Sequence, residues 1–479
     1  MIKSIVVCIV FLFIVAEKVQ SIHYQLTAAD SVMVITPYKD YHYAAFNMGK
    51  PTQFTLECDE PVNTIDISPK SKKIKGQIVT PHKLSFTIDS AGYYLIRINE
   101  KNKFFIFADK PETAPQGKIV NILSLGVDNT GLKNETSTIQ KAINKSSNAN
   151  YTLFFPRGIY KINSLQMRSN SRIHLARGAV LLADTKDINA FTSDNEVNTK
   201  RFISFDKVKN IRITGYGEIN LNGRDLRTLY GDKARMRLLL FVKSSDITLD
   251  GLFLKDPGSW NTQLIYSDHI ILRHIKMMND VDVSNTDGFD PDASQDIVVD
   301  NCFAYCGDDN VAIKTTNSSE LSRDVNNITI TNNVFLTKKS SLKIGTETRC
   351  NKISNVLFEN NDVIESDRGM AIYCSDGAEI SNISFINNHF ETCYPDGKRA
   401  CINVLVNQRR SDSKIGSIKN VLVKGCLFYE AFPRKSEIKT IDASRPIDVL
   451  FDNLTIAGKK IASTEDMGID VTNANIHFQ

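Results

Sequence analysis

The chain has 479 residues, of which 42% are hydrophobic and 23% are charged, and its formal net charge is +4. This length exceeds what one compact core usually supports, so we expect either two domains or one elongated repeat domain. A balance so close to neutral does not indicate the concentrated basic face of a nucleic-acid-binding protein, and we expect no nucleic-acid partner.

The first 21 residues have the pattern of a secretory signal peptide. A lysine at position 3 precedes an apolar run over residues 5–16, and small or polar residues follow at 19–21. The apolar run is short for a membrane span, and no second run of spanning length follows it. We therefore expect a secreted or periplasmic monomer that is not inserted in a membrane after cleavage of the signal.

Eight cysteines follow the expected cleavage point, and their irregular spacing fits no zinc-binding pattern. Most are expected to act as small buried hydrophobic residues of stacked strands. One or two disulfides would be compatible with export, and Cys393 with Cys401, which flank a Pro-Asp-Gly turn, is the first candidate pair. We expect neither a metal nor another cofactor.

Residues 22–110 consist of short alternating segments, such as 52–56 and 93–98, separated by turn residues. This pattern predicts a small β-sandwich. Residues 108–115 contain two prolines and are the expected domain boundary, so the second domain is predicted to cover residues 118–479.

Within the second domain, residues 136–145 have helical spacing and are expected to form the one substantial helix. From residue 151 onward, units of roughly 20 to 30 residues repeat, each with an Asn- or Asp-started strand. Residues 246–251, for example, read Asp-Ile-Thr-Leu-Asp-Gly, and residues 327–332 read Asn-Ile-Thr-Ile-Thr-Asn. The repeats predict an all-β fold, a right-handed parallel β-helix in which stacked Asn side chains satisfy one another's amides. The alternative, a sandwich of antiparallel hairpins, would need two-residue Asn-Gly or Asp-Gly turns, and few lie between the units.

Three carboxylates stand close together in this repeat. Residues 285–290 read Asn-Thr-Asp-Gly-Phe-Asp, and Asp308 and Asp309 follow Asp287 by 21 and 22 residues. If one turn of the coil takes about that many residues, the three side chains lie on adjacent strands roughly 4.8 Å apart. Like charges at that distance push their pKa values apart, and a protonated acid beside an ionised base can hydrolyse a glycosidic bond. The alternative is that these aspartates cap turns or bind calcium, and Asp290 and Asp292 are expected to be turn caps.

These two motifs, the β-helix repeat and a Gly-Val-Asp-Asn-Thr-Gly segment at residues 126–131 resemble glycoside hydrolase family 28. That is the polygalacturonase and rhamnogalacturonase family of pectin-lyase-like β-helices, and the likeness covers roughly residues 118–460. The small N-terminal domain is similar to the sandwich that precedes the β-helix in the dextranase and isopullulanase family 49.

The resemblance implies that Asp308 is the general acid and that Asp287 and Asp309 hold and deprotonate the attacking water. In this mechanism the anomeric configuration is inverted, with carboxyl groups roughly 6.5 to 9.5 Å apart. Asn285, in the same motif as Asp287, is implied to contact the substrate.

The chain also departs from the family pattern. Ser340 stands where polygalacturonases have the histidine of a Gly-His-Gly motif, and residues 371–373 read Ala-Ile-Tyr in place of an Arg-Ile-Lys that grips the galacturonate carboxylate. A carboxylate without a cationic partner loses a charge-assisted contact. Lys343, Arg349 and Arg368 are candidates for rebuilding an acid-binding site, with solvated strand ends as the alternative.

Four further residues are expected to bind substrate or to tune the site. Trp260 is either a sugar-stacking platform or a filler between rungs, and Tyr373 is suited to stacking on a neutral sugar ring. Glu347 is expected to hold a sugar hydroxyl, and Lys314 to adjust the charge of the paired aspartates; for both, the alternative is a solvated charge at a strand end.

The sequence thus predicts an exported inverting glycoside hydrolase whose partner is a polysaccharide or oligosaccharide, either pectin-like or a neutral glucan. A polysaccharide lyase on the same fold, with calcium and a Lys or Arg base, is one alternative. A non-catalytic carbohydrate-binding solenoid is the other.

Overall fold

The computed structural model describes residues 22–28, 31–39, 41–149, 151–193, 196–317, 320–394, 396–397 and 399–479. The expected signal peptide lies outside the described residues. The chain divides into two compact units, the first made of residues up to 110 without 68–73, and the second of residues 68–73 with Pro111–Gln479. None of the helices in the described part is long and apolar enough to cross a membrane.

The first unit is a β-sandwich, as its alternating pattern predicts. Its hydrophobic core lies between two sheets of five strands each, and residues from both, among them Phe54 and Ile106, are almost completely buried. The first sheet contains, in spatial order, β2 (Ser31–Val32), β1 (Tyr24–Ala28), β5 (Thr52–Cys58), β8 (Lys83–Ile88) and β7 (Gly76–Thr80). The second contains β3 (Thr36–Tyr38), β4 (Tyr41–Asn47), β10 (Asn102–Asp109), β9 (Gly92–Ile98) and β6 (Ile65–Ser68).

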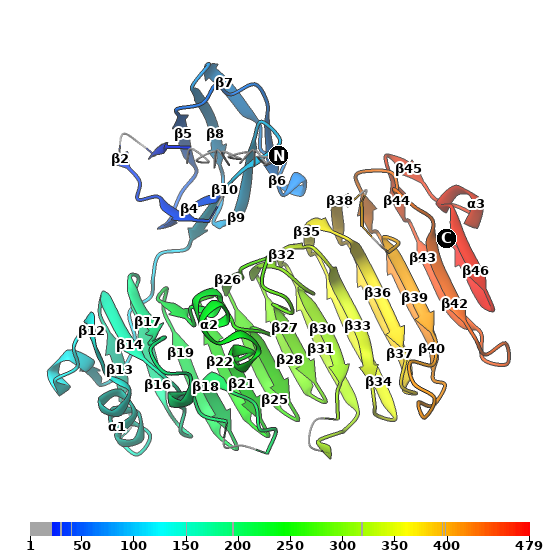
Figure 1. Ribbon diagram of the computed structural model, residues 1–479. Helices are drawn as coiled ribbons and strands as arrows, with labels where there is room; N and C mark the ends of the chain where they lie inside the picture. The colour runs from blue at the N-terminus through cyan, green and yellow to red at the C-terminus, as the bar shows by residue number, and fades with distance from the viewer. Residues whose placement is uncertain are drawn as a thin grey trace, which may run out of the picture. The chain divides into compact units, whose positions relative to one another are not determined.

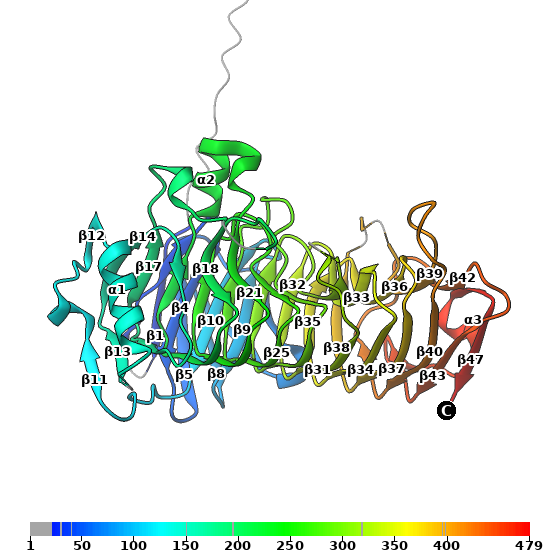
Figure 2. The ribbon, with the colours of Figure 1, turned by 90° about the horizontal axis from the view of Figure 1, so that it is seen from below.

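The second unit is a right-handed parallel β-helix, whose strands stack in sequence order from cyan to red in Figures 1 and 2. Three long sheets line its sides, and successive rungs contribute one strand to each. The first long sheet contains β11 (Ile119–Asn121), β13 (Thr152–Phe155), β16 (Arg172–Leu175), β19 (Lys209–Thr214), β22 (Ser245–Asp250), β25 (Asp268–Arg273), β28 (Gln295–Asp300), β31 (Val325–Thr331), β34 (Lys352–Glu359), β37 (Glu379–Ile386), β40 (Ser417–Lys424), β43 (Ile447–Asp452) and β47 (Ala474–Phe478).

The other two long sheets complete the coil. The second long sheet contains β12 (Thr130–Asn134), β14 (Gly158–Ile162), β17 (Ala179–Ala183), β20 (Glu218–Asn220), β23 (Phe253–Lys255), β26 (Lys276–Met278), β29 (Phe303–Cys306), β32 (Val334–Thr337), β35 (Asp362–Ser366), β38 (His389–Cys393), β41 (Leu427–Phe428), β44 (Thr455–Ile456) and β45 (Lys459–Lys460). The third long sheet contains β15 (Leu165–Gln166), β18 (Arg201–Asp206), β21 (Arg237–Val242), β24 (Thr262–Ile265), β27 (Phe289–Asp292), β30 (Val311–Thr315), β33 (Ser340–Thr348), β36 (Arg368–Cys374), β39 (Ile402–Val406), β42 (Ser436–Thr440) and β46 (Ile469–Thr472).

Alternation along each strand builds the core of the coil. In β28, Ile297 and Val299 point inward and are fully buried, while the other residues of the strand are partly exposed. Because the side-chain period of a strand is two, every rung adds a layer of Ile, Val, Leu or Phe to one continuous core. The expected amide ladder is confirmed at a buried corner, where Nδ2 of Asn333 donates to Asn361 at 2.8 Å and Nδ2 of Asn361 donates to Asn388 at 2.9 Å.

The helices lie outside this repeat. The predicted helix is α1 (Thr136–Ser146), one residue longer than expected, and it buries Ile139, Ala142 and Ile143. The sequence analysis missed α2 (Gly223–Tyr230), an eight-residue helix with Leu226 on its buried side, and α3 (Thr464–Met467) is a single turn. The 3₁₀ turns with bounds in the described part of the chain are η1 (Lys70–Lys72), η2 (Ile122–Leu125), η3 (Ile188–Ala190) and η4 (Gly231–Ala234).

The eight cysteines of the described part are free thiols. Seven are buried and Cys350 is partly exposed, in agreement with their expected use as small core residues. The candidate pair Cys393 and Cys401 is not joined by a disulfide.

Candidate active site

The register of the third long sheet brings the polar motifs together. Thr262 pairs with Phe289, and Phe289 pairs with Val311. The residues two positions before these three, Trp260, Asp287 and Asp309, therefore occupy equivalent positions on successive rungs. The same row continues through Ser340 to Arg368, which are paired directly.

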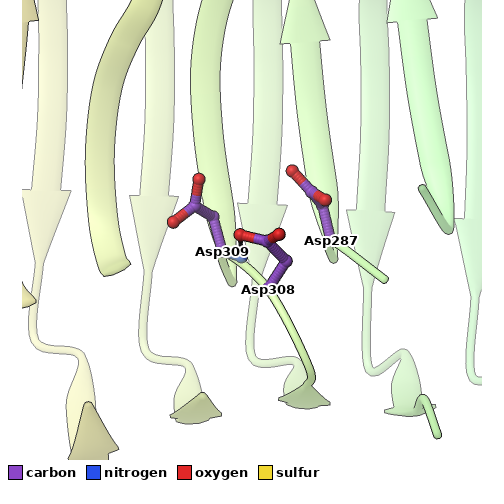
Figure 3. A group of neighbouring side chains, drawn as sticks. All are labelled: Asp287, Asp308 and Asp309. Carbon is purple, nitrogen blue, oxygen red and sulfur yellow. Dashed lines mark hydrogen bonds between the residues drawn. The ribbon is translucent and has the colours of Figure 1, made fainter. Parts of the chain in front are cut away.

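Asp287, Asp308 and Asp309 lie side by side (Figure 3), as the 21-residue spacing predicts. One carboxylate oxygen from each lies within 4.8 Å of those of the other two. Asp287 and Asp309 are each 4% exposed, while Asp308 is partly exposed. The closest oxygens are nearer than the roughly 6.5 to 9.5 Å between carboxyl groups that is usual for inversion.

Gly307 makes this close approach of rungs possible. A Cβ atom on Gly307, directly before Asp308, would lie 2.6 Å from Oγ1 of Thr286 and 2.8 Å from the carbonyl oxygen of Val281. Any larger residue would push the two aspartate-bearing rungs apart, so Gly307 belongs to the machinery that positions Asp308.

Asp309 is the ionised member of the trio. Nζ of Lys343 lies 2.6 Å from its Oδ2, and the backbone N–H of Ser340 donates to its Oδ1 at 2.9 Å. Burial alone would raise the pKa of Asp309, but the charges of Lys343 and Arg368 and the Lys343 hydrogen bond lower it to about 2. The residue that replaces the family histidine therefore still supports the trio, through its backbone.

Asp287 has the opposite environment. Its pKa is raised well above the ordinary value, first by burial and then by the negative charge of Asp290, while the charge of Lys314 opposes the shift. Nζ of Lys314 lies 3.5 Å from Asp287 and 2.7 Å from Asp290. Lys314 is 3% exposed; burial lowers its pKa, but the charges of Asp290 and Asp287 raise it overall, so it stays protonated beside them.

Asp308 is the member that solvent reaches. Burial, followed by the charge of Asp309, raises its pKa. Nδ2 of Asn285 lies 3.4 Å from its Oδ2, and Oδ1 of Asn285 accepts from Nη2 of Arg235 at 2.8 Å. The trio thus combines an ionised carboxylate with neighbours that hold a proton more tightly, and its titration belongs to the coupled group rather than to single residues.

The faces of Trp260 contact two cations. The guanidinium carbon of Arg237, from the rung before, lies 4.2 Å from the centre of the ring, and Nζ of Lys314, from two rungs after, lies 3.8 Å from it. Arg237 donates from Nε to Gln263 at 2.7 Å and from Nη1 to Ser259 at 3.1 Å. The indole holds these cations in place by cation–π contacts.

On the other side of the trio, Tyr373 and Arg368 project from β36. Tyr373 is 8% exposed, and burial raises its pKa against the opposing charge of Arg368. Nε of Arg368 is 3.8 Å from Asp367. Glu347 pairs with Nη1 of Arg409 at 2.7 Å; burial raises its pKa, but the charge of Lys314 and the contact with Arg409 lower it overall.

Arg349 does not join this group. It follows β33, at the opposite end of the strand from Ser340, and lines a separate cavity of about 680 Å³ with Arg323, Arg410 and Lys414. Of the predicted site residues, Trp260, Lys314, Lys343 and Arg368 lie around the trio, together with Asn285, Glu347 and Tyr373.

The structure corrects the expectation that Asp290 caps a turn. Asp290 lies within β27, is fully buried and pairs with Lys314. Burial, opposed by Lys314, raises its pKa to about 6. The signal in the sequence was its place in the same Asn-Thr-Asp-Gly-Phe-Asp motif as Asp287, at residues 285–290. Asp292 also lies within β27 and is fully buried, so it does not cap a turn of its own segment; it accepts from the backbone N–H of Thr316, on the next rung, at 2.9 Å.

The comparisons with known proteins agree with this geometry. The model of Glycosyl hydrolases family 28 matches residues 152–468, and the chain belongs to that family.

Curated relatives of this family 28 chain include a probable polygalacturonase of Vitis vinifera, 26% identical over 41% of this chain and 44% of the relative. An exo-poly-alpha-D-galacturonosidase of Dickeya chrysanthemi is 26% identical over 53% of this chain and 51% of the relative. The chain therefore spans about half the length of these relatives or less.

Solved structures share the fold of the family 28 chain. A family 28 exopolygalacturonase of Yersinia enterocolitica superposes with a TM-score of 0.62 and 16% identity, over 93% of this chain and 98% of that one. Dex49A from Penicillium minioluteum gives 0.60 and 13% identity, over 96% and 94%. The likeness to family 49 seen in the sequence is thus confirmed at the level of fold.

Proposed function

We propose that this family 28 protein is an exported hydrolase of a pectin-type polysaccharide. The observation that carries the proposal is the trio of adjacent aspartates, in which Asp309 is held ionised while burial and a neighbouring charge raise the pKa of Asp308. An acid and a base kept in different protonation states at one pH are what glycosidic hydrolysis requires.

In the proposed reaction, Asp308 gives its proton to the glycosidic oxygen as the bond to the anomeric carbon breaks. Asp309, with Asp287 beside it, orients a water molecule and takes its proton as the water attacks that carbon. Lys343 keeps Asp309 ionised. The positive charge of Lys314 opposes the rise in the pKa values of Asp287 and Asp290. The alcohol and the new reducing end then leave.

Acidic sugars fit the charges around the trio better than neutral ones. Arg368 lies on the β36 side, 14% exposed, with its nearest carboxylate contact at 3.8 Å, so its charge is incompletely neutralised. We infer that Arg368 takes the part of the missing Arg-Ile-Lys cations. A lyase is disfavoured because Lys314 and Lys343 are both engaged by aspartates and do not present a free base.

The test is reducing-end release from polygalacturonan, rhamnogalacturonan and dextran, with Asp308→Asn run in parallel. We expect release from a galacturonate-containing polymer and a loss of roughly 100- to 10,000-fold in kcat for the variant, the usual contribution of a general acid. Release from dextran alone would contradict the pectin-type substrate, and new ultraviolet absorbance in the product would identify a lyase. Equal activity of the variant would exclude Asp308 as the acid.

Proton NMR of the first product decides the stereochemistry. We expect the anomer opposite to the one in the substrate, because a water held by Asp287 and Asp309 attacks the face opposite the leaving group. Retention would mean that one of these two carboxylates is itself the nucleophile, which their short separation would then explain.

A further inference from the structure

Arg237 is a fixed cation two rungs before Asp287. It begins β21, its guanidinium stacks on Trp260, and Gln263 and Ser259 accept hydrogen bonds from Nε and Nη1. Three contacts from one segment of the next rung, residues 259–263, hold the planar group in one orientation. A cation held in this way loses little conformational entropy when it binds a ligand.

The charge of Arg237 is available to a ligand. Burial lowers its pKa to about 10, against the opposing charges of Asp290 and Asp287, so it is protonated at neutral pH. An arginine has five N–H donors, and two of them are used by Gln263 and Ser259. Within the described part of the chain no carboxylate forms an ion pair with Arg237. In contrast, Lys314 and Lys343 each lie within 2.7 Å of an aspartate.

A second cation stands beside it. Arg235 is exposed, and its Nη2 donates to Asn285, whose amide lies next to Asp308. Arg235 lies two residues before Arg237, the first residue of β21, and this places a partly exposed guanidinium and an exposed one on the same side of the trio. Nothing in the family motifs marks either residue, because both precede Asp287 by about fifty positions.

We propose that Arg237, with Arg235 at the rim, binds the carboxylate of an acidic sugar on the β21 side of the bond that is cleaved. Two strand spacings, about 10 Å, separate Arg237 from Asp287, so the sugar recognised is close to, but not at, the reacting carbon. The subsite rests on the proposed function, since it specifies the substrate of the same site. It makes the enzyme selective for polymers that keep a free carboxylate at that position.

Ligand binding tests the subsite without catalysis. The Asp308→Asn protein is titrated with trigalacturonate and with its methyl ester, and the measurement is repeated with Arg237→Gln added. We expect the acid form to bind at least tenfold more weakly after the Arg237 change, and the ester to bind equally to both proteins. Unchanged affinity for the acid, or no binding of it by the Asp308→Asn protein, would overturn the subsite.

Turnover separates the subsite from the catalytic proposal. On polygalacturonan, Arg237→Gln and Arg235→Gln in the active protein should raise KM with kcat within a few-fold, while Arg237→Lys should recover part of the loss. Arg212→Gln, an exposed change on β19 in the first long sheet, is the matched control and should leave KM unchanged. A fall in kcat with constant KM for Arg237→Gln would mean that the residue only shapes the aspartate group, and would overturn the subsite while leaving the hydrolase intact.

Discussion

Asp290 shows how one buried charge sets the behaviour of its neighbours. It is second only to burial among the causes that raise the pKa of Asp287, and its own pKa is raised to about 6 even with Lys314 at 2.7 Å. Like charges held in one site cannot all ionise together near neutral pH. The pH range over which the aspartate group keeps its catalytic proton therefore depends on Asp290, which does not belong to the trio.

Replacing Asp290 with Asn should move the alkaline limb of the pH–activity profile to lower pH. Removal of its negative charge lowers the pKa of Asp287, and through it the pH at which the coupled group loses its catalytic proton. The measurement is kcat/KM against pH on the polymer that the wild-type protein cleaves. Asp246→Asn, which removes a charge from the first long sheet, is the control and should leave the limb in place. A shift to higher pH in Asp290→Asn would contradict this account.

At the scale of the strands, the repeat of the sequence was the basis for predicting the fold and the grouping of the aspartates. The repeated Asn- or Asp-started strands indicated a parallel β-helix, and the spacing of Asp287 and Asp308 placed them on adjacent rungs, as the structure has them. Both follow from regular geometry, in which one rung repeats the previous one. Rung length nevertheless varies near the site, from 22 residues between Phe289 and Val311 to 31 between Val311 and Leu342, so the prediction of the fold depended on the repeated strand motif rather than on a fixed period.

The sequence could not place residues whose position depends on several rungs at once. Arg237 contacts Trp260 from a strand that begins about fifty residues before Asp287, and no motif joins them. Arg349 follows Lys343 by six residues, yet it lies at the far end of β33, because a strand carries its residues away from the site at about 3.3 Å each. The register shift between β30 and β33 adds a further irregularity that spacing alone does not predict.

The buried ladder of Asn side chains, which includes Asn361, should contribute more to stability than the exposed Asn ladder on the first long sheet. Asn361 is fully buried, donates to Asn388 and Ile330, and accepts from Asn333. We expect Asn361→Ala to destabilise the β-helix by about 2–4 kcal/mol, because it leaves buried donors and acceptors without partners. Unfolding in urea is the measurement.

Asn382 provides the comparison for Asn361. It is an exposed member of the ladder on the first long sheet, with an amide contact to Asn355 at 3.2 Å. Water can replace that contact, so Asn382→Ala should cost less than about 1 kcal/mol through the lost hydrogen bond. Equal destabilisation by the two changes would mean that the ladder acts through turn conformation rather than through buried hydrogen bonds.

For the molecule as a whole, the aspartate group makes stability depend on pH. Burial raises the pKa of Asp290 to about 6 in the folded protein, whereas an unfolded Asp has a pKa of about 3.9. The folded state therefore binds this proton more tightly. The stabilisation of the folded protein by the protonated Asp290 is fully present below a pH of about 4, and it is lost as the pH rises through about 6. Asp309, whose pKa is lowered to about 2, has the opposite sign and stabilises above pH of about 4.

Comparison of the wild-type protein with Asp290→Asn isolates the contribution of the Asp290 proton to the free energy of unfolding. The difference of about two pKa units corresponds to about 3 kcal/mol at most, spread over the coupled group. On going from pH 5 to pH 7.5, Tm of the wild-type protein should fall by a few degrees more than Tm of the variant, because only the wild-type protein must ionise this buried carboxyl. Parallel changes of Tm in the two proteins would mean that Asp290 is already ionised at pH 5. Lys314 would then neutralise the aspartates more completely than their burial opposes ionisation, and the catalytic proton would have to reside on Asp287 or Asp308 alone.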